Sequence, residues 1–248
     1  MGDFYRADIR QSSGETVTFL VRYSKPSDPI YQEGALVYSD RIKYGDVDRL
    51  DNSIAGRPCI GIEFDALNHA CYGEDETFLE PTSINNIPDG IKWIGDNVFE
   101  QKYGSVKLPD SVEYLGKYCF AYTHLENILL PSGIRSMGER CFYSTNLKEI
   151  VIPGNLTEIP EGCFSGHMDL KKIYINEGVR SIGKYGLISS GYIDDTKPDG
   201  RIVILPRSIA LIDDTALGGS YFRGTVYAYP GSYAFFWAKE HNYHVEAM

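Results

Sequence analysis

The feature that most constrains this chain is an internal repeat of about 22 residues. A proline, or in one copy an asparagine, follows each short apolar run, and successive copies are 21, 22, 22, 23 and 30 residues apart. These repeat positions are Pro88, Pro109, Pro131, Pro153, Asn176 and Pro206. A repeat of this length predicts a solenoid, in which each copy forms one coil that buries its apolar edge against the next coil.

Apolar residues recur at fixed distances after the repeat position. The third and sixth residues are aliphatic or methionine in all six copies, and the eleventh is bulky and apolar. The residues at the eleventh position are Phe99, Phe120, Phe142, Phe164, Leu187 and Leu217. The seventh position holds Gly95, Gly116, Gly138 and Gly183 in four copies, and Pro160 and Asp213 in the others. We expect the three apolar positions to line one continuous core.

Alternating apolar residues before the repeat position predict one short strand per copy, as at 128–130, 150–152 and 173–175. A second extended stretch and a tight turn that carries the phenylalanine complete the coil. Stacked coils pair their backbones at roughly 4.8 Å, so six coils predict a parallel ladder on the order of 25 to 30 Å long.

The repeated segments, taken together, resemble a known family of repeat proteins. Over about residues 82–248 the chain resembles the BspA-like subclass of bacterial leucine-rich repeats, as in the stretch LENILLPSGIRSMGERCF at 125–142. The ending TVYAYPGSYA, from residue 225, is similar to the cap that closes such arrays. The resemblance implies a leucine-rich repeat solenoid, mostly β with short helical or irregular turns. It also implies a surface-associated or secreted bacterial protein that binds other proteins or host components.

Each end of a stacked array leaves an open strand edge that must be covered to prevent aggregation. At the C-terminal end, Ser232 suits an N-cap and residues 233–241 predict a short helix. That helix would present Ala234, Trp237 and Ala238 on the side that closes the core.

The first 81 residues lack the repeat. Strand patterns at 16–21 and 35–38 predict a small antiparallel sheet, and the pattern at 59–64 predicts a further strand or a degenerate first coil. We expect this region to cap the other end of the array, with a separate small domain as the alternative. The expected organisation is therefore an N-terminal β region at 1–81, about six coils at 82–224 and a C-terminal cap at 225–248.

The charge balance restricts the partners. The formal net charge is -10, from 34 acidic and 24 basic residues, which disfavours nucleic acid and anionic membrane surfaces because both are bound chiefly through Lys and Arg.

No apolar run approaches the roughly eighteen residues that span a bilayer, so we expect no membrane insertion. The polar start has no signal-peptide pattern. The chain as written predicts a cytoplasmic protein, and a surface location requires that a leader was removed.

Three of the five cysteines occupy one repeated position. Cys119, Cys141 and Cys163 each stand directly before the repeated phenylalanine. The other copies have Val98, Gly186 and Ala216 there. Because the position selects small apolar residues and free cysteine behaves as one, we predict reduced core cysteines. Stacked coils would also hold the three sulfurs in a parallel row, which is poor geometry for a disulfide.

The sequence predicts no catalytic residue, no cofactor and no metal. Serine-hydrolase, zinc-protease, Walker and dinucleotide-binding motifs are all absent. His69 lies near Cys71, but no acid that would orient the imidazole is identifiable.

The longest step between copies contains an insertion at residues 189–200. Insertions in solenoids form loops on one face and often bind partners, so we name Tyr192, Asp194 and Asp195 as candidate binding residues of this loop. Asp195 and Asp199 faintly match a calcium loop, but Lys197 stands at a ligand position. A solvated loop is therefore favoured over a calcium site.

The strand alternation predicts a row of side chains that points away from the core, two residues before each repeat position. Its members are Lys107, Leu129, Val151, Tyr174 and Ile204. The outward row four residues before the repeat position contributes Glu149 and Lys172 as further candidates. Four of the five residues in the first row are apolar or aromatic, and contiguous exposed apolar surface usually marks an interaction site. Two alternatives explain the row without a binding partner. β-Branched and aromatic residues favour strands in any case, or residues 1–81 fold over the row and cover it.

Our leading hypothesis is a non-catalytic, adhesin-like module whose outer sheet face binds a protein partner or a glycan, with Tyr174 as an anchor. An intracellular scaffold or self-assembling subunit is the alternative. A polysaccharide-acting enzyme of the β-helix type comes third, because the stacked positions carry mostly aliphatic residues or Tyr in place of clustered acids. The sequence leaves the oligomeric state open.

Overall fold

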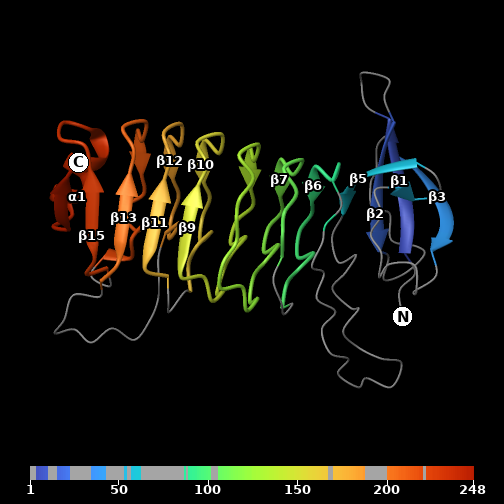
Figure 1. The fold of residues 1–248 in the computed structure, drawn as a ribbon, viewed down its shortest axis with the longest axis horizontal. Coiled ribbons are helices and arrows are strands. Elements are labelled where there is room, and N and C mark those ends of the chain that lie inside the picture. The colour runs from blue at the N-terminus through green and yellow to red at the C-terminus, as the bar shows by residue number, and fades with distance from the viewer. Residues whose placement is uncertain are drawn as a thin grey trace.

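A computed structural model of the chain shows stacked coils with a small β region at one end and a helix at the other (Figure 1). It describes the backbone of five N-terminal strands, together with residues 87, 89–101, 106–166, 170–187, 200–219 and 222–248. Successive coils pair in parallel, and the one described helix lies at the C-terminal end. The predicted repeat solenoid, mostly β with a helical cap, is confirmed.

The strands that precede the repeat positions form a five-stranded parallel sheet, which we call the long-strand sheet. Its order is β16-β15-β13-β11-β9. The members are β9 (Glu149–Ile152), β11 (Lys172–Ile175), β13 (Ile202–Leu205), β15 (Thr225–Ala228) and β16 (His244–Ala247). In β9, β11, β13 and β15 every second residue is buried, as the period-two alternation predicts.

Two-residue strands after the repeat positions form a second row along the array, which we call the short-strand ladder. The members are β6 (Trp93–Ile94), β7 (Tyr114–Leu115), β8 (Ser136–Met137), β10 (Glu158–Ile159), β12 (Ser181–Ile182) and β14 (Leu211–Ile212). β6, β7 and β8 pair in sequence, as do β10, β12 and β14, but β8 does not pair with β10. The ladder therefore has one interruption within the array.

The predicted strand at 128–130 is wrong. These residues, like 106–108 in the preceding copy, form no regular strand, although Leu108 and Leu130 are buried and Lys107 and Leu129 are exposed. The alternation thus places the side chains correctly without a hydrogen-bonded ladder. The physical reason is that alternation reports only which way side chains face, whereas a strand also needs a neighbour in hydrogen-bonding register.

The core lies between these two rows of strands and the phenylalanine turns. Every residue predicted at the third, sixth and eleventh positions is buried. Phe99, Phe120, Phe142 and Phe164 stack face to face along the array, with centroid separations of 5.0, 5.1 and 5.5 Å. This spacing matches the separation of adjacent strands, so one ring from each coil packs on the ring of the next.

The phenylalanine turns use a left-handed backbone that the sequence did not reveal. The ninth and thirteenth residues after the repeat position have φ between 51° and 58° in two successive copies, at Tyr118, Tyr122, Arg140 and Ser144. Glycines occupy both positions in the next copy, with φ of 62° and 81°. The turns hold the coils together by hydrogen bonds such as Tyr122 N–H to Tyr143 O, at 2.8 Å. These ladder bonds offset the cost of left-handed non-glycine residues.

The repeated glycine at the seventh position is required by the spacing of the coils. A Cβ atom on Gly138 would overlap the backbone nitrogen of Lys117 and lie 2.7 Å from its Cα. A Cβ on Gly116 would likewise overlap the backbone of Gly95 and Asp96. At these positions one coil therefore rests directly on the backbone of its neighbour.

The cysteine prediction is confirmed for the described cysteines of the array. Cys119, Cys141 and Cys163 are free and buried. Burial raises the pKa of the Cys141 and Cys163 thiols well above the ordinary value, which favours the neutral, unreactive form.

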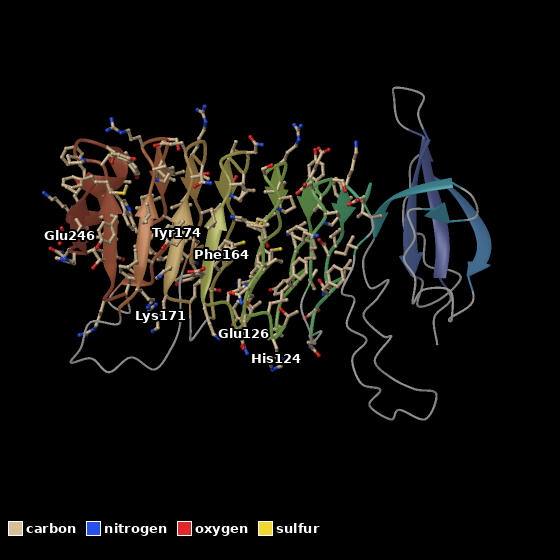
Figure 2. All side chains as sticks on the ribbon, viewed as in Figure 1. His124, Glu126, Phe164, Lys171, Tyr174 and Glu246 are labelled. Atoms are coloured by element: carbon tan, nitrogen blue, oxygen red, sulfur yellow. The ribbon has the colours of Figure 1, made fainter. Side chains whose placement is uncertain are left out.

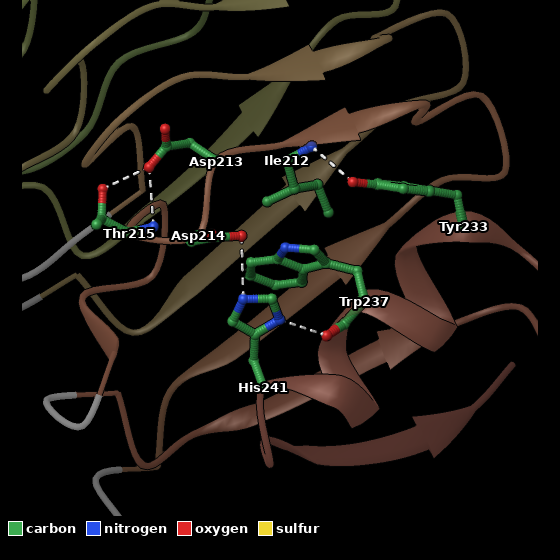
Figure 3. Close-up of polar contacts among 7 residues, drawn as sticks. All are labelled: Ile212, Asp213, Asp214, Thr215, Tyr233, Trp237 and His241. Atoms are coloured by element: carbon green, nitrogen blue, oxygen red, sulfur yellow. Dashed lines mark hydrogen bonds and ion pairs between the residues drawn. The ribbon is translucent and has the colours of Figure 1, made fainter.

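The C-terminal cap is built as predicted, around helix α1 (Tyr233–Glu240). Phe235 N–H donates to the Ser232 hydroxyl at 3.2 Å, so Ser232 is the N-cap, and Ala234, Trp237 and Ala238 are buried. His241 follows the helix. Its Nδ1 lies 2.8 Å from Trp237 O and its Nε2 lies 3.2 Å from Asp214 Oδ1 (Figure 3). These contacts attach the end of the helix to the loop after β14.

The N-terminal strands are β1 (Phe4–Arg10), β2 (Thr16–Arg22), β3 (Ala35–Ile42), β4 (Ser53–Ile54) and β5 (Arg57–Ile62). The predicted strands near 16, 35 and 59 are thus present, and β1 and β4 were not predicted. β1 pairs antiparallel with both β2 and β3, while β2 pairs in parallel with β5. β5 in turn pairs in parallel with β6, the first short strand of the array. The role of residues 1–81 as a cap and the boundary at residue 81 both remain predictions.

Three sequence hypotheses lie outside the described residues: the pair His69 and Cys71, the calcium-like residues Asp195 and Asp199, and the loop candidates Tyr192, Asp194 and Asp195. Among the residues that are described, no three His, Cys, Asp or Glu side chains are grouped so as to hold a metal ion. No helix in the same part of the chain is long and apolar enough to cross a membrane.

Candidate functional site

The outer face of the long-strand sheet carries two rows of side chains. Strand register places Val151, Tyr174, Ile204, Tyr227 and Glu246 side by side, which we call the apolar row after its first four members. The same register defines a polar row of Glu149, Lys172, Ile202, Thr225 and His244. Neighbours in each row are one strand spacing apart, about 4.8 Å.

The apolar row is accessible, most of all toward its N-terminal end. Val151 is 47% exposed, and Tyr174 and Ile204 are partly exposed. Leu129 occupies the equivalent place in the preceding coil and is 81% exposed. Figure 2 shows Tyr174 on β11, in the middle of the sheet. The row therefore forms a band of apolar surface that crosses at least four coils.

Charged residues border this band. Lys148 Nζ donates to Glu126 Oε2 at 2.6 Å in the loops that lead into the strands, and this hydrogen bond lowers the pKa of the Glu126 carboxyl. At the C-terminal end His244 Nε2 lies 3.1 Å from Glu246 Oε1. Figure 2 places Glu126 and Lys171 along the same lower edge of the array. An apolar centre with a charged, solvated rim is the usual composition of a protein interface.

The predicted orientation of the site residues is confirmed, while their role in binding stays a prediction. Lys107, Leu129, Glu149, Val151 and Lys172 are exposed, and Tyr174 and Ile204 are partly so. All but Lys107 and Leu129 belong to one hydrogen-bonded sheet. Sequence reasoning missed Tyr227 and Glu246, because both lie in the segment assigned to the cap. The signal was available, since residues 225–228 alternate like the strands before them.

The N-terminal strands do not account for this surface. β5 joins the array by pairing with β6 of the short-strand ladder, and the N-terminal strands extend the solenoid at its end (Figure 1). Leu129 and Val151 remain exposed. Strand propensity explains why Val, Ile and Tyr occur here, but it does not require that four of them share one outward row.

A comparison with protein families now bears on these features. The model for the BspA type leucine-rich repeat region matches residues 74–193, in six copies. This segment is a BspA-type leucine-rich repeat array. The copy at Pro206 lies beyond the match, yet its strands β13 and β14 continue both rows of the array. The predicted leucine-rich repeat resemblance is therefore confirmed, and such arrays generally mediate protein interactions and are typically non-catalytic.

One solved structure is similar to the chain, a leucine-rich repeat protein from Bacteroides ovatus. The two chains are 16% identical and superpose with a TM-score of 0.37. The match covers 98% of this chain but only 66% of the other, so this chain spans less than the full length of that protein. No curated protein matches the sequence.

Proposed function

We propose that this leucine-rich repeat array is a non-catalytic, adhesin-like module that binds a protein partner on the outer face of its long-strand sheet. The observation that carries the proposal is the apolar row, a band of exposed and partly exposed Val, Tyr and Ile side chains in register on one parallel sheet. The interaction role that is general for the family supports it.

The physical argument begins with solvation. An apolar band this exposed stays in contact with water unless a partner covers it, so its burial drives association. Tyr174 supplies a large ring with a hydroxyl at its tip, a combination that is enriched among the residues that dominate interface energies. The parallel ladder holds these side chains in place before binding, which lowers the entropy lost on association.

The test replaces Leu129 and Tyr174 together with Ser. Because both side chains point away from the core, we expect thermal unfolding to change little while capture of the partner is lost. The matched control is Leu211→Ser with Tyr185→Ser, since Leu211 is 62% exposed and Tyr185 41% exposed outside the long-strand sheet. Partner capture that survives the first pair of changes, or is lost equally in the control, would refute the placement.

A self-assembling subunit is the second candidate function. The exposure of Leu129 favours it as well, because a second copy of the chain could cover Leu129 and Val151. Light scattering after size exclusion separates the two functions. A dimer that dissociates when Leu129 and Tyr174 are replaced supports self-assembly, whereas a monomer that still captures a different protein supports the proposed function.

A further inference from the structure

The copy at Pro153 departs from the glycine rule at its seventh position, where Pro160 stands. In the neighbouring copies the N–H of this residue donates to the strand of the preceding coil. Examples are Gly138 N–H to Leu115 O and Gly183 N–H to Ile159 O, both at 2.8 Å. Proline has no N–H, so Met137 O does not receive the equivalent bond.

The interruption of the short-strand ladder lies at this place. β8 and β10 do not pair, although every other neighbouring pair in the ladder does. On the turn side the same two coils remain joined, by Arg140 N–H to Glu161 O at 2.9 Å and Phe142 N–H to Cys163 O at 3.0 Å. The coils are therefore held together at the turns, while β8 and β10 do not pair.

A groove of about 300 Å³ opens between the separated strands. Its lining includes Arg135, Ser136, Met137, Glu139, Glu158 and Pro160. This volume is at the lower end of the range for small-ligand sites. The groove lies on the outer face of the short-strand ladder and shares no residue with the apolar row.

A stacked aromatic pair lies one strand away from the groove. Register places the outward side chains of Trp93, Tyr114 and Ser136 next to one another on β6, β7 and β8. The Trp93 and Tyr114 rings stack with centroids 4.7 Å apart, so Trp93 covers one face of Tyr114. The next residue in the row is the small Ser136, which is the first of the row to line the groove.

The polar groups of the groove favour a ligand that donates hydrogen bonds and carries no negative charge. Both cations of the lining are paired: Lys117 Nζ lies 3.2 Å from Glu139 Oε2, and Arg135 Nε lies 3.0 Å from Glu113 Oε2. Glu158 has an exposed carboxylate, and the Arg135 and Met137 carbonyls lack the ladder bonds that equivalent carbonyls accept elsewhere. These free carbonyl and carboxylate oxygens can accept hydrogen bonds from a ligand.

We propose that this groove binds a neutral pyranose residue of a glycan. Tyr114, which lies next to the small Ser136, would be the stacking surface, and the freed carbonyls and Glu158 would accept hydrogen bonds from its hydroxyl groups. A pyranose combines an apolar C–H face, which can stack on an aromatic ring, with a rim of hydroxyl groups that can donate to the freed carbonyls and to Glu158. An anionic sugar would meet Glu158 without a free cation to offset it.

The test uses the full chain and four neutral probes, which are the hexasaccharides of cellulose, xylan, laminarin and mannan. Oligogalacturonate is the anionic comparison. We expect saturable binding of at least one in titration calorimetry, with a change in tryptophan fluorescence. Trp93, 42% exposed, is the reporter, because Trp237 is buried in the cap. Tyr114→Leu should weaken binding roughly two- to tenfold, the value of one aromatic contact. Leu211→Ser, in the same ladder, is the control and should leave affinity unchanged.

A second variant tests the origin of the groove. Pro160→Gly restores the missing N–H, so it should join β8 to β10, close the groove and abolish sugar binding while the protein unfolds at the same or a higher temperature. The change of Leu129 and Tyr174 to Ser should leave sugar binding intact, which keeps this proposal separate from the protein-binding one. No binding of any of the four neutral probes at millimolar concentration, binding only of oligogalacturonate, or binding that Pro160→Gly does not alter would overturn the proposal.

Discussion

A single methyl group at position 138 should destabilise the array severely. In Gly138→Ala the new Cβ would overlap Lys117 N and lie 2.5 Å from Gly116 C, whereas ordinary contacts between carbon atoms are about 3.5 to 4.0 Å. One coil must therefore move by roughly 1 Å relative to the other. That shift strains the bond of Gly138 N–H to Leu115 O, at 2.8 Å. Overpacking costs about 1 to 3 kcal/mol, and one weakened hydrogen bond costs about 1 kcal/mol. Together they predict that the free energy of unfolding falls by about 3 kcal/mol.

The assay is urea unfolding, followed by circular dichroism and by tryptophan fluorescence. Gly133→Ala is the matched control in the same coil, because its Cβ would lie 3.5 Å from Asp110 O, an ordinary contact, and its φ is outside the left-handed region. We expect this control to be neutral or stabilising by up to about 1 kcal/mol, through the lower entropy of the unfolded chain. The reasoning would be refuted by a Gly138→Ala midpoint within error of the wild type, or by equal losses in both variants.

Two further predictions concern the C-terminal cap. Ser232→Ala removes the acceptor for Phe235 N–H and should lower the free energy of unfolding by about 1 kcal/mol; an unchanged urea midpoint would contradict the N-cap assignment. Asp213 accepts bonds from the Thr215 hydroxyl at 2.6 Å and the Thr215 N–H at 2.8 Å, and these lower the pKa of its carboxyl. Because the folded pKa is below the unfolded one, the bonds stabilise the fold above the unfolded pKa, and this contribution is lost as the pH falls through the folded pKa. A carboxyl titration by NMR should show the Asp213 midpoint rise in Thr215→Val, and a midpoint that does not move would exclude the hydroxyl as a cause.

The sequence predicted the inward side of the array well. Every phenylalanine or leucine at the eleventh position is buried, and α1 begins at the predicted residue with Trp237 turned inward. These predictions succeed because burial of apolar side chains at a fixed period is the dominant constraint on a stacked coil, and each copy repeats the evidence. The outward orientation of Val151 and Tyr174 follows from the same alternation.

The sequence predicted backbone details less well. The strand at 128–130 was wrong, since alternation does not report whether a neighbour is in register. The left-handed turns at Tyr122 and Arg140 were missed, because neither residue type marks a positive φ in the way glycine does. Pro160 was visible as a departure from the repeat, but the groove depends on how two coils lie in space. The outward row of residues was thus predictable. Its extension onto Tyr227 was missed, although residues 225–228 alternate like the strands before them.

The most direct test of the account is a photo-cross-linking amino acid placed at Val151, compared with the same amino acid at Leu211. Both positions are exposed, but only Val151 lies in the apolar row of the long-strand sheet. If the protein partner binds that face, the probe at 151 should cross-link to it and the probe at 211 should not. A partner that cross-links from 211 but not from 151 would contradict the account.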